Sequence, residues 1–549
     1  MESAAINPNA GRDRSPLVDM LLIAGPVVAT MTSYTLMQFI DGLMVSRIGP
    51  DPVYVAAQGN GSVAAWVPTA TLMGLLSVVN TYVSQNLGAR HAERGSAYAW
   101  AGLWLCFFAW VLVMLPYAVV LPTIMRIISD HSPSLLALET GYARLLLAGS
   151  FFAIAARCIA QYFYGMHKPL TVFGAVLAGN AVNLVVNSFL IYGPTPPAIG
   201  GAAGGVLSAW FEFTGSTCRV LGIPAMGVAG AAIATVIGTV VEFAIPMARF
   251  LGRRFNTLYG TRRAWRPSLA HMRDLFRLGW PGALMLGNEI VCWAYLMTAL
   301  IGHFGEVHNT AGWIALRYMH LAFMPAVGLS IAVTAQVGKC MGMKRPDLAV
   351  RRAWLGVSLT MAYMGVCALG FVLFRHEAIG LFIDPTTAPE QRAELIRIGS
   401  EVMIAAAVFQ LFDALGITLI GALRGAGDTV WPGIITLVLA WTCIVLGGHA
   451  MIRFFPEFGS LGPWIAASVY IMLLGSSMCV RFVLGRWKRI DLLGHAARPA
   501  EASGSDAAPM DVPPVTQRNM PVSALVTPLT PESPLHPEAS PARDSAPEL

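Results

Sequence analysis

The sequence predicts an all-α polytopic membrane protein, with twelve transmembrane helices in two six-helix lobes related by pseudo-two-fold symmetry. Three observations predict it: composition, the alternation of positive charge between loops, and an internal repeat. Of 549 residues, 56% are apolar and only 12% are charged, whereas soluble domains carry about 25% charged residues. The mean hydropathy is +0.61. Because a helix of about 20 mostly apolar residues crosses the hydrocarbon core, the chain has room for a dozen crossings.

Breaks at prolines, glycines and charge clusters divide the chain into twelve apolar segments. Each is expected to be a helix, because backbone groups in lipid must be hydrogen-bonded within their own segment. The first six are residues 17–46, 53–84, 96–122, 137–164, 170–193 and 226–250. The second six are residues 274–302, 311–338, 353–374, 397–422, 430–454 and 461–484. No cleavable signal peptide is expected before the first segment.

Lys and Arg residues are distributed unequally between alternate loops. One set of loops carries 23 of them and the other set carries seven. Because loops rich in positive charge face the cytoplasm, both termini are expected to be cytoplasmic. A missed helix would disturb the alternation, so the bias also supports an even number of crossings. The net charge of +6 belongs to these loops, and no nucleic-acid partner is expected.

The segments and loops together predict five regions. These are a cytoplasmic N-terminus (1–16), an N-lobe (17–250), a basic cytoplasmic linker (251–273), a C-lobe (274–485) and a cytoplasmic tail (496–549). The N-lobe includes a long Gly/Pro-rich external loop, 194–225, with an apolar centre around Trp210 and Phe211. The tail holds eleven of the 35 prolines, a composition that predicts disorder.

Two short motifs recur at a constant separation. Gly25-Pro26 in the first segment corresponds to Trp280-Pro281 in the seventh, and residues 83–90 correspond to 337–344, at an offset of 254–255 residues. Six segments separate each pair, so the halves have parallel topology. Such repeats are typical of transporters in which the substrate binds between the lobes near the midplane.

An ordered series of motifs resembles the multidrug and toxic compound extrusion (MATE) family, in particular its NorM-like members. The motifs are Pro26 with residues 39–49, 180–193, 227–235, Gly279-Trp-Pro281 with Glu289, and 409–413 running into 421–429. Each motif is weak alone, but their order matches from about residue 15 to 485. The resemblance implies a cation antiporter that exports amphipathic, often cationic, small molecules or drugs by alternating access.

Asp41 is the candidate coupling residue of the N-lobe. An ionised carboxylate at the bilayer centre costs about 2.5–3.5 kcal/mol even on permissive scales, so it needs an explanation. The resemblance implies a proton or cation site in a polar pocket with Asn183, Asn187 and Thr235. The two asparagines are four residues apart and share a helix face. Many proton-coupled relatives carry Asp at the position of Asn187, so Asp41 is here the single carboxylate. An interfacial Asp41 near Arg47 is the alternative.

Glu289 and Asp413 are the candidates in the C-lobe, where no Lys or Arg lies within one helical turn of either. The resemblance implies that they bind the coupling cation with an aromatic residue one turn before the aspartate, which is Phe409 here, and with support from Gln410. Phe409 has no phenolic oxygen, whereas a hard cation prefers oxygen ligands. The coupling ion, Na⁺ or H⁺, therefore stays open, and no metal is expected beyond Na⁺ at this pair.

Two further charges in the segments also need partners. Arg317 is expected to be the counter-ion of Glu289 or Asp413, and in the purely structural alternative Arg317 or His320 uses these carboxylates to tie helices together. Glu242 is expected to have an interfacial role near the cytoplasm, seven residues from Arg249.

Pro26 and Pro281 occupy equivalent points of the two lobes. A proline inside a helix removes a backbone hydrogen bond and favours a bend. These prolines would let the first and seventh helices bend or straighten as the carboxylates change charge. Static kinks that serve packing are the alternative.

Other functions are less favoured. The sequence has no P-loop, HExxH or Ser/His/Asp series, so ATP-driven transport and enzymatic activity are not expected. The eight scattered cysteines are read as apolar fillers of membrane helices. An exporter of one metabolite stays open, whereas a lipid-precursor flippase would have extra segments and a basic cavity. We expect a monomer of the bacterial inner membrane, with no cofactor, whose partners are the lipid bilayer and small-molecule substrates.

Overall fold

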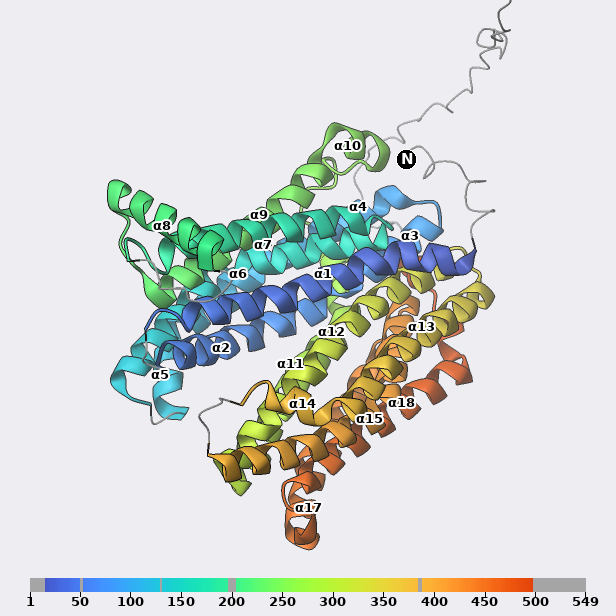
Figure 1. Ribbon diagram of the computed structural model, residues 1–549. Helices are drawn as coiled ribbons and strands as arrows, with labels where there is room; N and C mark the ends of the chain where they lie inside the picture. The colour runs from blue at the N-terminus through green and yellow to red at the C-terminus, as the bar shows by residue number, and fades with distance from the viewer. Residues whose placement is uncertain (1–14, 50–52, 129–130, 196–203, 384–387, 497–549) are drawn as a thin grey trace, which may run out of the picture. The chain divides into compact units, whose positions relative to one another are not determined.

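The computed structural model describes residues 15–49, 53–128, 131–195, 204–383 and 388–496. These residues form helices and no strand, and twelve of the helical segments are long and apolar enough to cross a membrane. The predicted fold class is therefore confirmed (Figure 1). Nearly all of the predicted cytoplasmic N-terminus 1–16 and tail 496–549 lies outside the described residues.

The N-lobe contains the first six crossings. They are α1 (Pro16–Val45); α2 (Val53–Leu76) continued by α3 (Val78–Gly88); α4 (Ala92–Ala109) continued through a π-helical turn by α5 (Leu115–Ile128); α6 (Pro133–Gly165); α7 (Pro169–Leu190); and α9 (Gly227–Leu251). Ser15 and Ser132 cap α1 and α6 by accepting from the backbone N–H of Val18 and Leu135, and a proline follows each cap. Both features are typical helix starts.

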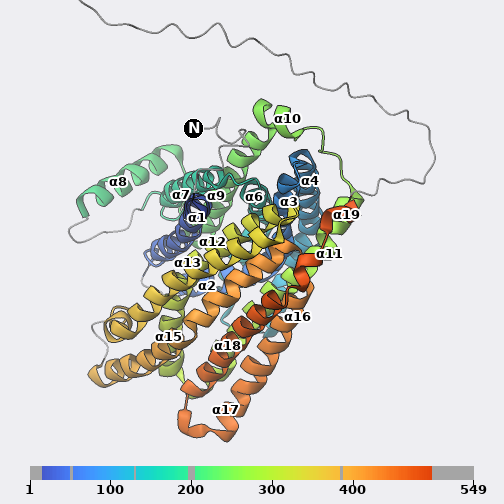
Figure 2. The same cartoon turned by 90° about the vertical axis from the view of Figure 1, so that its right-hand side faces the viewer.

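The C-lobe contains the other six. They are α11 (Leu269–Tyr295) with the π-helical Leu296–Ile301; α12 (Glu306–Gly342); α13 (Pro346–Leu373); α15 (Pro389–Ala426); α16 (Val430–Leu439) continued through the π-helical Ala440–Gly447 by α17 (Gly448–Phe454); and α18 (Leu461–Leu484). The short helices α14 (Arg375–Gly380) and α19 (Leu492–Ala496) lie outside the crossings. Helix α18 packs against both α15 and α16 and lies between them (Figure 2).

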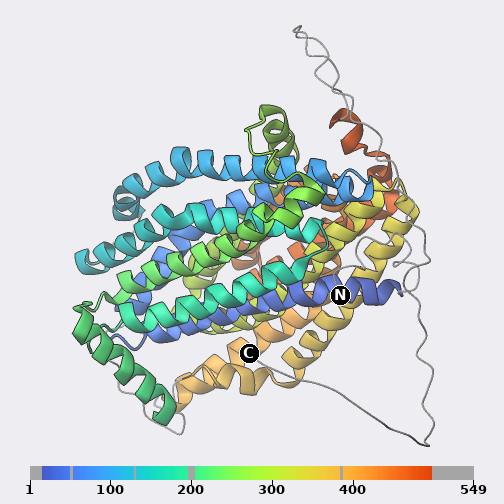
Figure 3. The same cartoon turned by 90° about the horizontal axis from the view of Figure 1, so that it is seen from above.

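The predicted external loop 194–225 contains a helix that the sequence analysis did not predict, α8 (Gly204–Leu221). Its apolar centre explains the difference, because Phe211 is buried against the ring of Tyr192 at 5.4 Å. The indole N–H of Trp210 donates to the Ser188 hydroxyl at 3.1 Å. These contacts attach α8 to α7 at the edge of the N-lobe (Figure 3).

The predicted linker 251–273 begins with α10 (Arg253–Tyr259). Its chain then follows α4, where the indole N–H groups of Trp100 and Trp104 donate to the carbonyl oxygens of Thr261 and Trp265 at 2.7 and 2.9 Å. The middle of the linker is therefore bound to the N-lobe.

The lobes meet through positions related by the 254-residue offset. A Cβ on Gly282 of α11 would lie 2.8 Å from the carbonyl oxygen of Gly74 in α2. The equivalent pair is Val28 of α1 and Gly328 of α12, where a Cβ on the glycine would lie 2.9 Å from the Val28 Cα. Helices α1 and α12 accordingly run side by side (Figure 1). This matched pair of contacts is what a pseudo-two-fold axis requires.

Gly88 of α3 and Gly342 of α12 are also offset partners, and they face each other. A Cβ on Gly88 would lie 3.1 Å from the Gly342 Cα and would overlap the Lys339 carbonyl oxygen. A Cβ on Gly342 would overlap the Gln85 carbonyl oxygen in the same way. The two backbones touch only because neither residue has a side chain. We call the end of the bundle that contains Gly88 and Gly342 the closed end.

Polar contacts also join the lobes at the closed end. Side chains of α3 donate to C-lobe carbonyl oxygens, in the pairs Asn80–Ile331 (3.4 Å), Thr81–Arg424 (2.9 Å) and Gln85–Gly425 (2.9 Å). Arg352 of α13 donates to the Pro16 carbonyl oxygen at 2.6 Å and pairs with Asp19 at 3.3 Å. The start of α1 is therefore at the closed end, the end that the charge bias assigns to the cytoplasm.

His167, in the turn between α6 and α7, also contacts the other lobe. Its Nε2 lies 3.2 Å from the Ala335 carbonyl oxygen of α12. Burial, together with the charge of Lys339, lowers the pKa of His167 to about 3. An unfolded histidine takes up its proton near pH 6.5. Because the folded protein keeps His167 neutral while the unfolded chain takes up a proton, the free energy of unfolding decreases as the pH falls from about 6.5 toward 3.

We predict that Gly88→Ala lowers the melting temperature, because the methyl group overlaps the Lys339 backbone. Overpacking of this kind costs roughly 1–3 kcal/mol. Thermal unfolding of the detergent-solubilised protein, followed by tryptophan fluorescence, measures the change. Gly174→Ala on α7 is the matched control, since a Cβ there meets nothing within 4 Å, and it should not lower the melting temperature. Equal melting temperatures for the two variants would contradict the close backbone contact of Gly88 with Lys339 at the closed end.

Candidate functional site

The predicted N-lobe pocket is assembled from three helices. The Nδ2 of Asn187 on α7 donates to Asp41 Oδ1 on α1 at 2.6 Å and to Asn183 Oδ1 at 2.8 Å. The Nδ2 of Asn183 lies 3.4 Å from the hydroxyl of Thr235 on α9. All four predicted residues are thus in one chain of contacts, and Asp41 bonds across the lobe instead of to Arg47.

The pocket keeps unused oxygen acceptors. Asn187 is fully buried, and its Oδ1 accepts no hydrogen bond from the described part of the chain. Asp41 is half-buried, and among the described residues only its Oδ1 is hydrogen-bonded. These oxygens are chemically suited to a proton or a small hard cation. Close packing holds the pocket together, because a Cβ on Gly238 of α9 would lie 2.9 Å from the Asn183 Cβ.

The C-lobe carboxylates also come together. Glu289 on α11 and Asp413 on α15 are both half-buried and interact electrostatically with each other. Phe409 and Gln410 lie on α15 one turn before Asp413 and are 3% and 1% exposed. Within the described ranges, the Nε2 of Gln410 has no hydrogen-bond partner. The site therefore combines two carboxylates with an unused amide.

Sequence reasoning missed Tyr470 of α18, which is 1% exposed and whose hydroxyl has no hydrogen-bond partner among the residues that the structure describes. Gly475 of α18 packs on Gly416 of α15, so Tyr470, five residues earlier, is about one turn from the level of Asp413. Tyr470 interacts electrostatically with both carboxylates. A hydroxyl in an apolar helix carries no sequence signal for this position.

The prediction that Arg317 is the counter-ion of Glu289 or Asp413 was wrong. Arg317 is exposed, and its guanidinium lies 5.6 Å from the centroid of the Phe382 ring. No ion pair joins it to either carboxylate within the part of the chain that the structure describes. His320 is exposed as well. Neither side chain contributes to the electrostatics of Glu289 or Asp413, and the charge pattern of α12 did not reveal how this helix is rotated about its axis.

Glu242 was also misassigned, since it is 8% exposed instead of interfacial. It accepts a hydrogen bond from the hydroxyl of Tyr34 on α1. Tyr34 in turn lies beneath the guanidinium of Arg157 on α6, a charge within a span that sequence reasoning overlooked.

Pro26 and Pro281 lie inside the continuous helices α1 and α11, as predicted. The Thr30 hydroxyl donates to the Pro26 carbonyl oxygen at 2.7 Å. Pro281 is covered by α16, where a Cβ on Gly433 would lie 2.6 Å from the Pro281 Cβ. These contacts describe one state, so the bending of the two helices stays a prediction.

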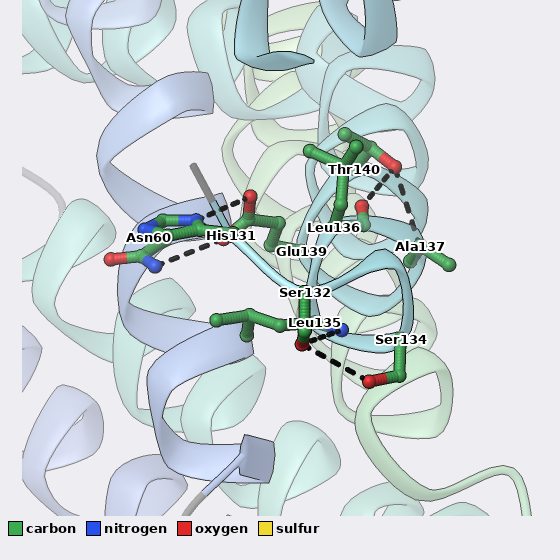
Figure 4. Close-up of polar contacts among 9 residues, drawn as sticks. All are labelled: Asn60, His131, Ser132, Ser134, Leu135, Leu136, Ala137, Glu139 and Thr140. Atoms are coloured by element: carbon green, nitrogen blue, oxygen red, sulfur yellow. Dashed lines mark hydrogen bonds and ion pairs between the residues drawn. The ribbon is translucent and has the colours of Figure 1, made fainter. Parts of the chain in front are cut away.

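A second polar cluster missed by sequence reasoning lies toward the opposite end from Gly88 and Gly342. Glu139 of α6 is fully buried and lies 3.0 and 3.1 Å from the Nδ1 of His131 through its two carboxylate oxygens (Figure 4). The Nδ2 of Asn60 on α2 donates to Glu139 Oε2 at 2.9 Å. The cluster ties α2 to the start of α6, and a Cβ on Gly61 would come within 2.7 Å of the Glu139 carbonyl oxygen.

Comparisons with known proteins agree with this geometry. The sequence profile of the MatE family matches residues 26–189 and 285–447, one block in each lobe. The chain is 26% identical to a Synechococcus protein named "Probable multidrug resistance protein NorM" over 86% of its own length and 94% of that protein. It is 28% identical to a Pseudomonas putida protein of the same name, over 88% and 97%.

A solved structure has the same fold. It is described as an outward-facing conformation of a multidrug resistance MATE family transporter of the MOP superfamily. The TM-score is 0.74 at 21% identity, with 87% of this chain and 98% of that chain covered.

We predict that His131→Ala destabilises the protein by roughly 1–3 kcal/mol, because the fully buried Glu139 loses a partner. His91→Ala is the matched control: His91 pairs with Glu93, but the side chains are 54% and 57% exposed, and exposed pairs contribute about 0–1 kcal/mol. Melting temperatures measured side by side test this. A His131→Ala protein as stable as the control would show that Asn60 alone satisfies the carboxylate.

Proposed function

The chain belongs to the MatE family of membrane transporters, and from this premise we propose that it exports amphipathic small molecules, drugs among them, in exchange for Na⁺ or H⁺. Its relatives are named NorM multidrug resistance proteins, and these names support the export of several different drugs. The observation that carries the proposal is the pair of half-buried carboxylate sites, one in each lobe, in a bundle whose lobes are closed together at one end.

Alternating access follows from this geometry. With the closed end on the cytoplasmic side, the described state is closed to the cytoplasm. Transport then requires the contacts of Gly88 and Gly342 to separate as the opposite end closes. A ligand can drive such a change only by binding the two states with different affinity.

The carboxylates supply that difference. A proton or Na⁺ entering from outside neutralises Asp41, or Glu289 with Asp413, and changes whether a cationic substrate is held there. One elementary charge moving inward through 100 mV releases about 2.3 kcal/mol, which drives roughly a fifty-fold gradient of an electroneutral substrate.

In the C-lobe we assign an oxygen ligand to Tyr470. Phe409 cannot provide one, whereas the Tyr470 hydroxyl is buried, has no hydrogen-bond partner among the described residues and interacts electrostatically with both carboxylates. The C-lobe site would then offer three oxygen-bearing side chains to a hard cation. The protein works as a monomer in this scheme, because each lobe contains its own complete site.

We predict that Asp41→Asn and Asp413→Asn each reduce cation-driven ethidium efflux from proteoliposomes at least tenfold, because the amide cannot take up a proton or balance a cation. Na⁺ and pH gradients are imposed separately. Glu93→Gln, at an exposed position near the closed end, should transport as the wild type does. Wild-type rates in both aspartate variants would contradict the assignment.

We predict that Tyr470→Phe raises the Na⁺ or H⁺ concentration for half-maximal efflux about tenfold, because loss of a hydrogen bond or ligand to a charge costs about 1.5 kcal/mol. Tyr162→Phe is the matched control, since Tyr162 is also fully buried with an unpartnered hydroxyl but lies in the N-lobe. An unchanged cation dependence in Tyr470→Phe would remove this residue from the site.

A further inference from the structure

Helix α8 presents three different sides to its surroundings. The side that packs into the N-lobe is buried and carries Phe211, Thr214 and Cys218. A second side, which we call the apolar stripe, is exposed and carries Trp210, Phe213, Val220 and Leu221. A third side, which we call the polar stripe, is exposed and carries Glu212, Ser216 and Arg219. Residues three, four or seven positions apart share one side of a helix, so each set forms a continuous surface.

The apolar stripe is not a surface that water favours. Phe213, Val220 and Leu221 are 57%, 85% and 66% exposed. Thr217 lies among them, but its hydroxyl donates to the Phe213 carbonyl oxygen at 2.8 Å, so its polar group is bonded within the helix. A continuous exposed apolar surface marks a place where a protein or a membrane binds. The polar stripe on the other flank of α8 is, in contrast, suited to water.

The apolar stripe continues a lipid-facing surface of α7. Helix α7 lies on the outer side of the N-lobe, because α1 separates it from α12 (Figure 1). Leu177 and Leu184 are exposed on this spanning helix, and Ser188 follows four residues later on the same face. Exposed apolar side chains of a spanning helix contact the hydrocarbon core. The indole of Trp210 bonds to Ser188, so the apolar stripe begins where the lipid-facing surface of α7 ends.

The position of α8 is that of a helix at the membrane surface. It lies between the end of α7 and the start of α9, at the end of the bundle opposite Gly88 and Gly342. It runs across the end of α7 (Figure 3), and it is not one of the twelve spans. Amphipathic helices in the plane of a bilayer bury their apolar face at the boundary of headgroups and acyl chains, where tryptophan is enriched.

We propose that α8 is a membrane-surface anchor, whose apolar stripe inserts into the lipid bilayer while its polar stripe faces water. The partner is the acyl-chain region of the bilayer and not its charged headgroups, because the two charges of α8, Glu212 and Arg219, are of opposite sign and lie on the polar stripe. The proposal concerns a surface outside the transport sites, and it does not depend on which molecules the protein exports.

The anchor is attached beside the N-lobe pocket. Ser188, which accepts a hydrogen bond from Trp210, directly follows Asn187 of the pocket. Tyr192, on which α8 packs, donates to the Met44 carbonyl oxygen at 2.7 Å near the end of α1. Insertion of α8 therefore holds the ends of α1 and α7 at the membrane surface, and these are the two helices that share the hydrogen bond of the pocket.

The test measures which solvent each stripe contacts in vesicles of neutral phosphatidylcholine. Nitroxide labels are attached to single introduced cysteines, in a protein whose three half-buried native cysteines are replaced by alanine, namely Cys367, Cys443 and Cys479. Phe213→Cys reports on the apolar stripe, and Glu212→Cys, the adjacent residue on the polar stripe, is the matched control. Relaxation of each label by oxygen, which dissolves in lipid, is compared with relaxation by a water-soluble nickel complex.

We expect the ratio of oxygen to nickel relaxation to be higher by roughly fivefold or more at Phe213→Cys than at Glu212→Cys, because an interfacial helix has one face in lipid and the other in water. Val220→Cys should behave like Phe213→Cys, and Ser216→Cys like Glu212→Cys. Equal ratios on the two stripes would overturn the proposal. Labels on the apolar stripe that neither reagent reaches and that broaden one another would also overturn it, because they would assign this stripe to contact with a second copy of the chain.

A second measurement needs no introduced cysteine. Phosphatidylcholine brominated close to the headgroup should quench less tryptophan emission in Trp210→Phe than in the wild type, because one lipid-contacting indole has been removed. Trp464→Phe is the matched control, since Trp464 is 1% exposed, and it should leave the quenched emission unchanged. Quenched emission that is the same in Trp210→Phe and in the wild type would contradict the contact of α8 with lipid.

Discussion

Direct backbone contact between the two lobes is the constraint on which the rest of the structure depends. Gly88 and Gly342 allow α3 and α12 to touch, and the pairs Gly74–Gly282 and Val28–Gly328 continue the contact on either side of the axis. Side chains cannot replace these contacts, because the space for a Cβ is already taken by the facing backbone. The lobes are thereby held at one end, and the carboxylates keep their places within each lobe without bridging the two.

The fold and the N-lobe pocket could be predicted from the sequence, because both depend on the length and spacing of residues along single helices. Apolar length defines a crossing, and the spacing of Asn183 and Asn187 places them on one face, where the structure puts Asp41 and Thr235 beside them. How each helix is rotated and placed against helices distant in the sequence could not be predicted. The rotation of α12 about its axis decides whether Arg317 faces a carboxylate or not, and no local pattern encodes that rotation. Tyr470 joined the C-lobe site through the packing of α18 on α15, which is equally non-local.

Two other differences had signals in the sequence that were overlooked. Glu139 and Arg157 are charges inside apolar segments, and their position alone marks them as groups that require partners. The helix α8 was hidden by the Gly/Pro-rich composition of its flanks. Its apolar residues, including Phe211, gain by burial against α7, and that gain depends on the tertiary neighbour.

The geometry of α1 has a mechanical consequence. Its first part, up to Val28, packs on the other lobe, whereas Asp41 near its far end bonds only within its own lobe. Pro26 lies within the first part, at a point where the backbone lacks one helical hydrogen bond. If α1 bends there, as predicted, a displacement of Asp41 is transmitted along α1 to the backbone contacts that join the lobes.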